Sequence, residues 1–207
     1  ELLANAVESD RIVKTAYYRI LAPALLPSIN RAIYLDCDII ANTSLHELWQ
    51  TNLEGNVIAA VEDAGFHDRL EKMGITKENE KYFNSGMMLI DLVRWRARST
   101  TQKVLDYINQ NPEKLRFHDQ DALNANLYDD WLHLHPQWNA QSNIIMETIF
   151  PPRTELLEPY AETREDPKLI HFCGHVKPWH EGCEHPYADV YLKYHEMASN
   201  QGVRVSG

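Results

Sequence analysis

Two acidic residues separated by one position are the sharpest chemical signal in this chain. Asp36 and Asp38 lie at the carboxyl end of the run 31–36, whose β-branched and aromatic residues predict a strand. Carboxylates at positions i and i+2 of an extended segment point to the same side, so both can reach one cation. The alternative is a strand-end turn in which the two side chains accept hydrogen bonds from backbone N–H groups.

A second group of metal-type ligands lies between residues 171 and 185. Its spacings match no pair of Cys-x2-Cys knuckles, which disfavours a structural zinc site, although Zn²⁺ on Cys173, His175 and Cys183 remains an alternative. His171 lies in the predicted strand 168–173, where one imidazole could join two distant carboxylates. Two carboxylates and one imidazole with open positions suit Mn²⁺ better than Mg²⁺, which prefers oxygen ligands.

Composition and charge limit the partners of this chain. Its 207 residues are 44% hydrophobic and 24% charged, which is typical of a globular protein. The 20 basic and 30 acidic residues give a net charge of −10, which disfavours nucleic acid and requires a local cation for any anionic substrate. Three cysteines indicate a reducing compartment, and no apolar run reaches the length of a transmembrane segment, so we expect a soluble protein.

Alternating helix and strand patterns predict an α/β protein with one large domain. A first helix is expected over 9–21, with Pro23 and Pro27 stopping it. Further helices are expected over 44–49, around 104–108 with an end at Asn111-Pro112, over 120–127, and over 187–197. Strands are expected over 31–36, which reads as buried, and over 56–61, 83–90 and 168–173. Asp91 is expected to cap the helix that follows the third strand.

Five blocks of the sequence, in this order, resemble glycosyltransferase family 8. They are YYRI at 17–20, YLDCD at 34–38, YFNSGMMLID at 82–91, HDQDALN at 118–124, and HFCG at 171–174 with KPW at 177–179. This family contains retaining enzymes of the GT-A type, among them bacterial lipopolysaccharide galactosyl- and glucosyltransferases. The resemblance implies a Rossmann-like mixed sheet flanked by helices. It also implies Mn²⁺-dependent transfer of galactose or glucose from a UDP-sugar to a saccharide acceptor.

The resemblance assigns the metal and diphosphate contacts to particular residues. Asp36, Asp38 and His171 would bind Mn²⁺, and Asp38 would also lie near the ribose or the donor sugar. Gly174 and Lys177 would contact the diphosphate, where Lys177 would neutralise the charge of the leaving group.

The resemblance also assigns residues that would contact the donor sugar. Arg19 would bind the sugar or its phosphate, and Asp63 and Asn84 would bind sugar hydroxyls. Asp119 and Gln120 would be the catalytic residues of the sugar pocket, with Gln120 facing the anomeric carbon. An amide is a poor nucleophile, which favours attack from the face of the leaving group, while Asp119 leaves a covalent route open.

The sequence departs from the family at its beginning. Relatives start with a strand that binds uridine, whereas this sequence starts at the helix that carries Arg19. We therefore expect residues 1–207 to be one glycosyltransferase domain without the N-terminal nucleotide-binding strands. It would be a portion of a longer polypeptide or be covered by another chain, with an apolar surface exposed near the strand that begins at Ala32. We expect the protein to be located in the cytoplasm of a bacterium, either free or attached to the surface of the inner membrane.

Two other classes of function could use the same residues. Phosphatases of the haloacid-dehalogenase type place an Asp-x-Asp pair after an apolar strand, with the first carboxylate as nucleophile and the second as general acid. Here Ile40 occupies a position that is usually Thr or Val, and the other four blocks stay unexplained. The remaining alternative is a non-catalytic chain that binds zinc or a partner through the loop rich in His and Cys.

Overall fold

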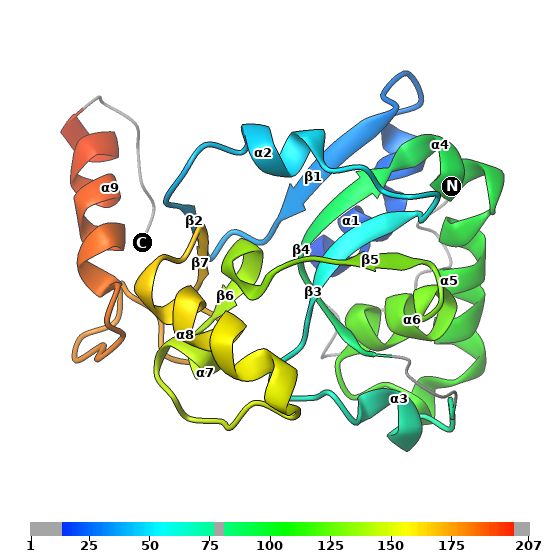
Figure 1. The fold of residues 1–207 in the computed structure, drawn as a ribbon. Coiled ribbons are helices and arrows are strands. Elements are labelled where there is room, and N and C mark those ends of the chain that lie inside the picture. Colours follow the sequence, from blue (N-terminus) through cyan, green and yellow to red (C-terminus); the bar gives the residue numbers. More distant parts are fainter. Residues whose placement is uncertain (1–13, 77–80, 201–207) are drawn as a thin grey trace.

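The computed structural model describes residues 14–76 and 81–200, which form a mixed α/β fold with two neighbouring sheets (Figure 1). The strands are β1 (Arg31–Leu35), β2 (Ile39–Ala41), β3 (Ile58–Glu62), β4 (Phe83–Asp91), β5 (Trp131–His133), β6 (Ala140–Gln141) and β7 (Leu169–His171). The α-helices are α1 (Lys14–Leu25), α2 (His46–Gln50), α3 (Arg69–Lys72), α4 (Leu92–Ala97), α5 (Thr100–Gln110), α6 (His118–Leu127), α7 (Ser142–Ile145), α8 (Leu157–Glu165) and α9 (Ala188–Asn200).

Both sheets contain parallel and antiparallel pairs, which confirms the expected mixed sheet. In the four-stranded sheet, with the order β1-β4-β3-β5, β4 is antiparallel to both neighbours and β3 is parallel to β5. In the three-stranded sheet, with the order β2-β7-β6, β7 is antiparallel to β2 and parallel to β6. Because β1 belongs to the first sheet and β2 to the second, residues 36–38 connect the two sheets.

Strand β4 is the centre of the core and is buried on both faces. Met88 and Ile90 pack into an apolar cluster with residues of α5 and α6. Met87 and Leu89 point to the opposite face, where they pack with residues of α2 and β7. Successive side chains of a strand alternate between faces, so an apolar run of this kind suits a strand that is covered on both sides. The burial of β4 also holds the polar residues at its start in place.

Helix α1 confirms the first predicted helix, with residues 9–13 outside the described part. The predicted stop at Pro23 is wrong, whereas the end of the helix at Leu25 agrees with a stop at Pro27. The helix continues past Pro23, which lies inside it. A proline removes one N–H donor from a helix, and that loss is small near the last turn, where carbonyls need other partners anyway. Arg96 supplies one such partner by donating to the carbonyl of Pro23 at 3.3 Å.

Most other predicted elements are confirmed, with bounds that differ by a few residues. The predicted strands correspond to β1, β3, β4 and β7, and the predicted helices to α2, α5, α6 and α9. Strands β2, β5 and β6 were not predicted, because two or three residues are too few to show a period.

Strand β1 is half-buried along its whole length, so the prediction of a buried strand is wrong. It lies at the edge of its sheet in the described part of the chain, and an edge strand has a neighbour on one side only. Leu25, Leu26 and Ile29, which directly precede β1, are 60%, 42% and 43% exposed. This agrees with the expected apolar surface near Ala32, whereas the expectation of a longer polypeptide stays a prediction.

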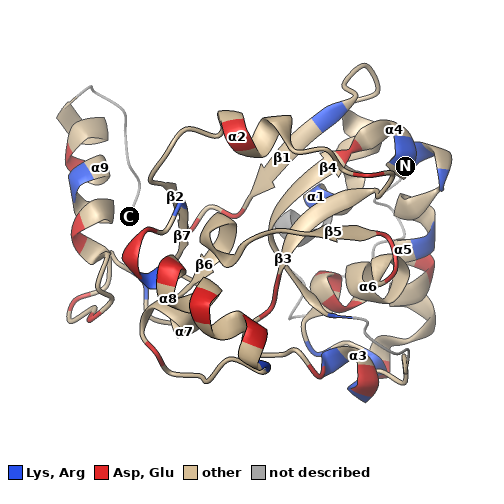
Figure 2. Cartoon of the chain, viewed as in Figure 1, with Lys and Arg blue, Asp and Glu red and all other residues tan. Residues whose placement is uncertain are grey.

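The described helices show no membrane-spanning character. None of them is both long enough and apolar enough to cross a membrane. In Figure 2, basic and acidic residues alternate along α3 and α9.

Replacement of Asp91 should measure the capping interaction at α4. Its side chain accepts a hydrogen bond from the Arg94 backbone N–H at 2.9 Å, which confirms the predicted cap. We expect Asp91→Ala to reduce the free energy of unfolding by about 1 kcal/mol and to lower the melting temperature by about 2–4 °C. Asp106→Ala, at an exposed acid in the helix α5, is the control. Equal melting temperatures for the two variants in calorimetry would contradict a capping role.

Candidate active site

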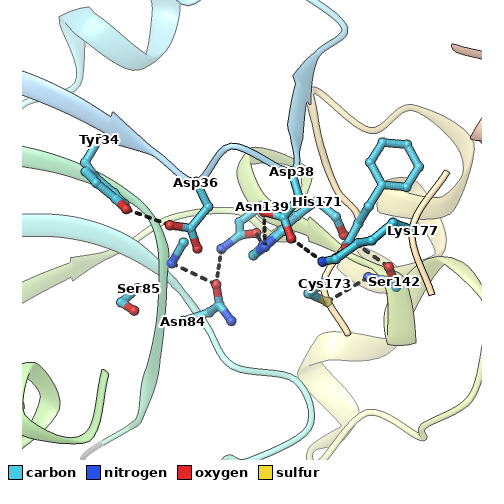
Figure 3. A network of polar contacts seen from close by, with 12 residues as sticks. Tyr34, Asp36, Asp38, Asn84, Ser85, Asn139, Ser142, His171, Cys173 and Lys177 are labelled. Carbon is cyan, nitrogen blue, oxygen red and sulfur yellow. Dashed lines mark hydrogen bonds and ion pairs between the residues drawn. The ribbon is translucent and has the colours of Figure 1, made fainter. Parts of the chain in front are cut away.

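Three side chains from the junction of the two sheets form the centre of the site (Figure 3). Asp36 follows β1, Asp38 precedes β2, and His171 ends β7, which pairs with β2 so that Ile39 lies opposite His171. One ligand atom from each of the three side chains lies within 4.8 Å of the other two, and Asp38 Oδ1 is 3.4 Å from His171 Nε2. The strand pairing therefore brings the predicted metal ligands together, while metal binding itself stays a prediction.

Each carboxylate of the pair uses one oxygen for a cation. Arg19 Nη2 donates to Asp36 Oδ1 at 2.8 Å, and the Tyr34 hydroxyl donates to the same oxygen at 2.7 Å. Lys177 Nζ pairs with Asp38 Oδ2. Asp36 Oδ2 and Asp38 Oδ1 take no part in these contacts and are available to a further cation.

Asp38 is held in its ionised form. Burial by itself would raise the pKa of this carboxyl, but hydrogen bonds and charge interactions with His171 and Lys177 outweigh burial and hold the pKa well below its ordinary value. Lys177 is oriented by a second hydrogen bond, from Nζ to the carbonyl of Phe172 at 2.6 Å. Since metal ions bind the deprotonated carboxylate, this arrangement prepares Asp38 to act as a ligand.

Gly86 of β4 leaves the space that an ion would need. A Cβ atom at this position would lie 2.4 Å from His171 Cε1 and 3.0 Å from Asp36 Oδ2, so a side chain would fill the centre of the site. Two carboxylates and one imidazole around this space fit Mn²⁺ in number and type of ligand. Gly86 lies in one of the matching sequence blocks, but sequence reasoning did not identify its role. That role depends on the side chains of His171 and Asp36, which pack against Gly86 in the folded protein.

A chain of side-chain hydrogen bonds orients the His171 ring. His171 Nδ1 lies 2.8 Å from Asn139 Oδ1, and Asn139 Nδ2 donates to Asn84 Oδ1 at 3.0 Å. Asn84 Oδ1 also accepts from the Gly86 N–H at 3.1 Å, and Asn84 Nδ2 donates to Asp63 Oδ2 at 3.0 Å. A backbone N–H can only donate and an ionised carboxylate can only accept, so the direction of each bond follows. When the ring is neutral, as metal binding requires, its proton is on Nδ1, and Nε2 presents its lone pair to the proposed metal position.

The two predicted catalytic residues lie in the first turn of α6, in different surroundings. Gln120 Nε2 donates to Asp63 Oδ2 at 3.0 Å, and Gln120 Oε1 accepts from the Ser85 N–H at 3.0 Å. Asp119 instead pairs with Arg19 Nε at 3.1 Å. Burial raises the pKa of Asp119, against the effect of Arg19. Gln120 thus belongs to the hydrogen-bonded group around Asp63, and Asp119 belongs to the ion pairs around Arg19.

A cavity of about 550 Å³ opens beside these residues, with Asp63 and Asn84 in its wall. This volume is within the usual range for small-molecule sites. Gly174, the predicted diphosphate contact, also lines the cavity and has a φ of +101°, a backbone conformation that favours glycine. The cavity is therefore placed to hold a substrate against the predicted sugar-binding residues.

The structure does not favour the zinc alternative. Among the described residues, Asp36, Asp38 and His171 form the only group of three or more His, Cys, Asp or Glu side chains close enough to share an ion. Cys173, His175 and Cys183 do not form such a group. Burial raises the pKa of the Cys173 thiol, and its sulfur accepts a hydrogen bond from the Ser142 N–H at 3.3 Å. A thiol in this setting resists the deprotonation that zinc binding requires.

Comparison with known proteins identifies the family. Residues 3–183 match the model of glycosyl transferase family 8. The chain therefore belongs to glycosyl transferase family 8, and the resemblance carried by the five sequence blocks is confirmed.

Individual relatives agree with this assignment. General stress protein A of Bacillus subtilis (strain 168) is 48% identical over 194 residues, which cover 92% of this chain and 68% of that protein. Lipopolysaccharide 1,2-glucosyltransferase of Escherichia coli (strain K12) is 27% identical over 196 residues, covering 89% of this chain and 54% of that protein. The crystal structure of the galactosyltransferase LgtC with donor and acceptor sugar analogs has a TM-score of 0.79 at 24% identity, covering 92% of this chain and 69% of that one. The fold is thus of the GT-A type, as expected.

Replacement of Asn139 should release the His171 ring. We expect Asn139→Ala to weaken Mn²⁺ binding about 10- to 100-fold in calorimetry, because the acceptor that holds the proton on Nδ1 is lost. Imidazole ¹⁵N spectra of the metal-free protein should change from the Nδ1–H form to a mixture of both tautomers. Asn126→Ala is the matched control, since the Asn126 side chain donates to the Ala122 carbonyl of its own helix at 2.8 Å. Unchanged affinity and an unchanged tautomer in Asn139→Ala would show that Asn139 does not orient the ring.

A methyl group at position 86 should close the metal position. Because the added Cβ would lie 2.4 Å from the His171 ring, we expect Gly86→Ala to reduce Mn²⁺ affinity at least tenfold while circular dichroism shows a folded protein. Gly74→Ala is the control, because it adds the same methyl group at a turn where no neighbouring atom lies within 4 Å of the new Cβ. It shows whether a loss of stability by itself lowers the Mn²⁺ affinity. Equal Mn²⁺ affinity in the wild type and Gly86→Ala would place the ion elsewhere.

Proposed function

We propose that this chain is a Mn²⁺-dependent retaining glycosyltransferase that transfers galactose or glucose from a UDP-sugar to a saccharide acceptor. The observation that carries the proposal is the group formed by Asp36, Asp38 and His171, whose ligand atoms lie within 4.8 Å of one another. Asn84 connects this group to the cavity, because it lines the cavity and hydrogen-bonds the side chain that orients His171. Membership of family 8 supports a transferase.

The leaving diphosphate gains negative charge as the bond from its oxygen to the anomeric carbon breaks. Mn²⁺ held by the three ligands would supply a Lewis acid that neutralises part of this charge. Lys177, which its two hydrogen bonds hold beside Asp38, provides a fixed cation on the same side. Fixed charges aimed at a developing anion stabilise the transition state more than the ground state, and so accelerate the step.

The donor sugar would lie against Asp63, Asn84 and Gln120, whose polar groups bind its hydroxyls. We infer attack from the face of the leaving group. The acceptor oxygen bonds to the anomeric carbon as the phosphate oxygen departs. The departing phosphate oxygen takes the hydroxyl proton of the acceptor. Asp119 is a poor candidate for a covalent nucleophile because it is buried in an ion pair with Arg19.

The acceptor and the location follow from relatives and composition. Relatives that match most of this chain are named lipopolysaccharide glucosyltransferases, which makes a cell-surface glycan the proposed class of acceptor. The three cysteines are free, which suits the cytoplasm of a bacterium.

The phosphatase alternative does not fit the same geometry. It would use Asp36 as nucleophile, but it does not explain the match of residues 3–183 to glycosyl transferase family 8. It also leaves the positions of Lys177 and His171 beside Asp38 without a role. We therefore do not carry it further.

Replacement of Asp38 tests the proposed function. We expect Asp38→Asn to lower Mn²⁺-dependent release of UDP by about 100-fold or more, because a charged ligand is lost at the point where charge develops. UDP-galactose and UDP-glucose are assayed separately, which also identifies the donor. Asp68→Asn, at a surface acid paired with Lys72, is the control. Undiminished turnover in Asp38→Asn would refute the metal assignment.

A further inference from the structure

Arg116 is fixed in the wall of the cavity, just before α6. Its backbone N–H and that of Phe117 both donate to Asp121 Oδ2, at 2.6 and 2.8 Å, and Asp121 is fully buried. Its guanidinium lies over the rings of Phe66 and Phe117, with 5.3 and 5.1 Å between Cζ and the ring centroids. Part-buried hydrogen bonds to Asp121 thus hold the backbone of Arg116. Arg116 is exposed to solvent, and two aromatic faces lie against its guanidinium.

The guanidinium of Arg116 donates no hydrogen bond within residues 14–76 and 81–200. Every other arginine in these ranges pairs with a carboxylate or donates to a backbone carbonyl; examples are Arg69 with Asp121 and Arg153 with Glu62. An unpaired arginine is notable in a chain with 30 acidic and only 20 basic residues. Its N–H groups are therefore available to a ligand.

The charges around the cavity favour an anion at Arg116. Among the described residues that line the cavity, Arg116 is the only Lys or Arg, and Asp63 is the only Asp or Glu. Hydrogen bonds offset part of the charge of the Asp63 carboxylate, because Oδ1 accepts from the Gly65 N–H at 3.0 Å and Oδ2 accepts from Asn84 and Gln120. With a net charge of −10, the protein as a whole repels anions, so an anionic substrate needs a local cation.

We propose that the acceptor saccharide carries an anionic group, a carboxylate or a phosphate, which the guanidinium of Arg116 binds. This inference rests on the proposed transferase function and specifies the acceptor of that same site. The planar fork of a guanidinium matches both anions through two parallel hydrogen bonds. Arg116 lies apart from the predicted metal ligands and determines which acceptor binds, so its loss should raise the acceptor KM and leave the donor KM unchanged.

Binding of three glycosides to the full chain, with Mn²⁺ and UDP present, tests this proposal. The neutral probe is p-nitrophenyl β-D-glucoside, and the charged probes are its 6-phosphate and p-nitrophenyl β-D-glucuronide. We expect at least one charged probe to bind about tenfold tighter than the neutral probe in calorimetry at low ionic strength, and the preference to shrink as salt is added. The charged probe that is preferred identifies the source of the anion.

Two variants with the same change in net charge separate a local from a global effect. Arg116→Gln should abolish the preference for the charged probes, whereas Arg94→Gln, at an exposed arginine of α4, should retain it. A preference that is absent from the wild type, a preference that survives in Arg116→Gln, or failure of all three probes to bind would each overturn the proposal. Mn²⁺-dependent release of UDP, measured on the same preparations, shows separately whether the proposed transferase function holds.

Discussion

Two carboxylates held next to each other at the junction of the sheets are the constraint on which the site depends. Like charges at short range repel, and burial adds a further cost, so the pair persists only because cations neutralise it. Arg19 from α1 contacts one carboxylate and Lys177 from the last loop contacts the other. Each cation takes one oxygen and leaves the second oxygen free. This charge balance would leave one oxygen of each carboxylate to the proposed metal ion.

The hydrogen-bond chain from Asp63 through Asn84 and Asn139 to His171 connects the sugar side of the site with the metal side. Every hydrogen bond in this series has one allowed direction, so the loss of a bond at one end weakens the bonds toward the other end. Strand β4 supplies Asn84 and is buried on both faces, which gives the chain a rigid support. Binding of the donor sugar and binding of the metal ion are therefore expected to reinforce each other.

The two halves of the site are built from different parts of the fold. The proposed donor half uses buried strand ends and the first turn of α6, where a substitution also disturbs the core. The proposed acceptor half uses side chains on short segments, where Phe66 and Asn143 are half-buried and Arg116 is exposed. Loops tolerate substitution better than packed strands, so a family can keep one donor chemistry while its acceptors differ. In our proposal, Arg116 is the residue that gives this chain a preference for an anionic acceptor.

The sequence by itself determined the α/β class, most of the longer elements, the family and the three predicted metal ligands. Local period and the spacing of Asp36 and Asp38 carry that information, because they reflect a few neighbouring residues. The tertiary structure decided the position of β1 at a sheet edge, the short strands, the need for glycine at position 86, and the role of Asn139. These features arise where strands far apart in the chain pair and bring side chains within hydrogen-bond distance, and no local pattern encodes such contacts.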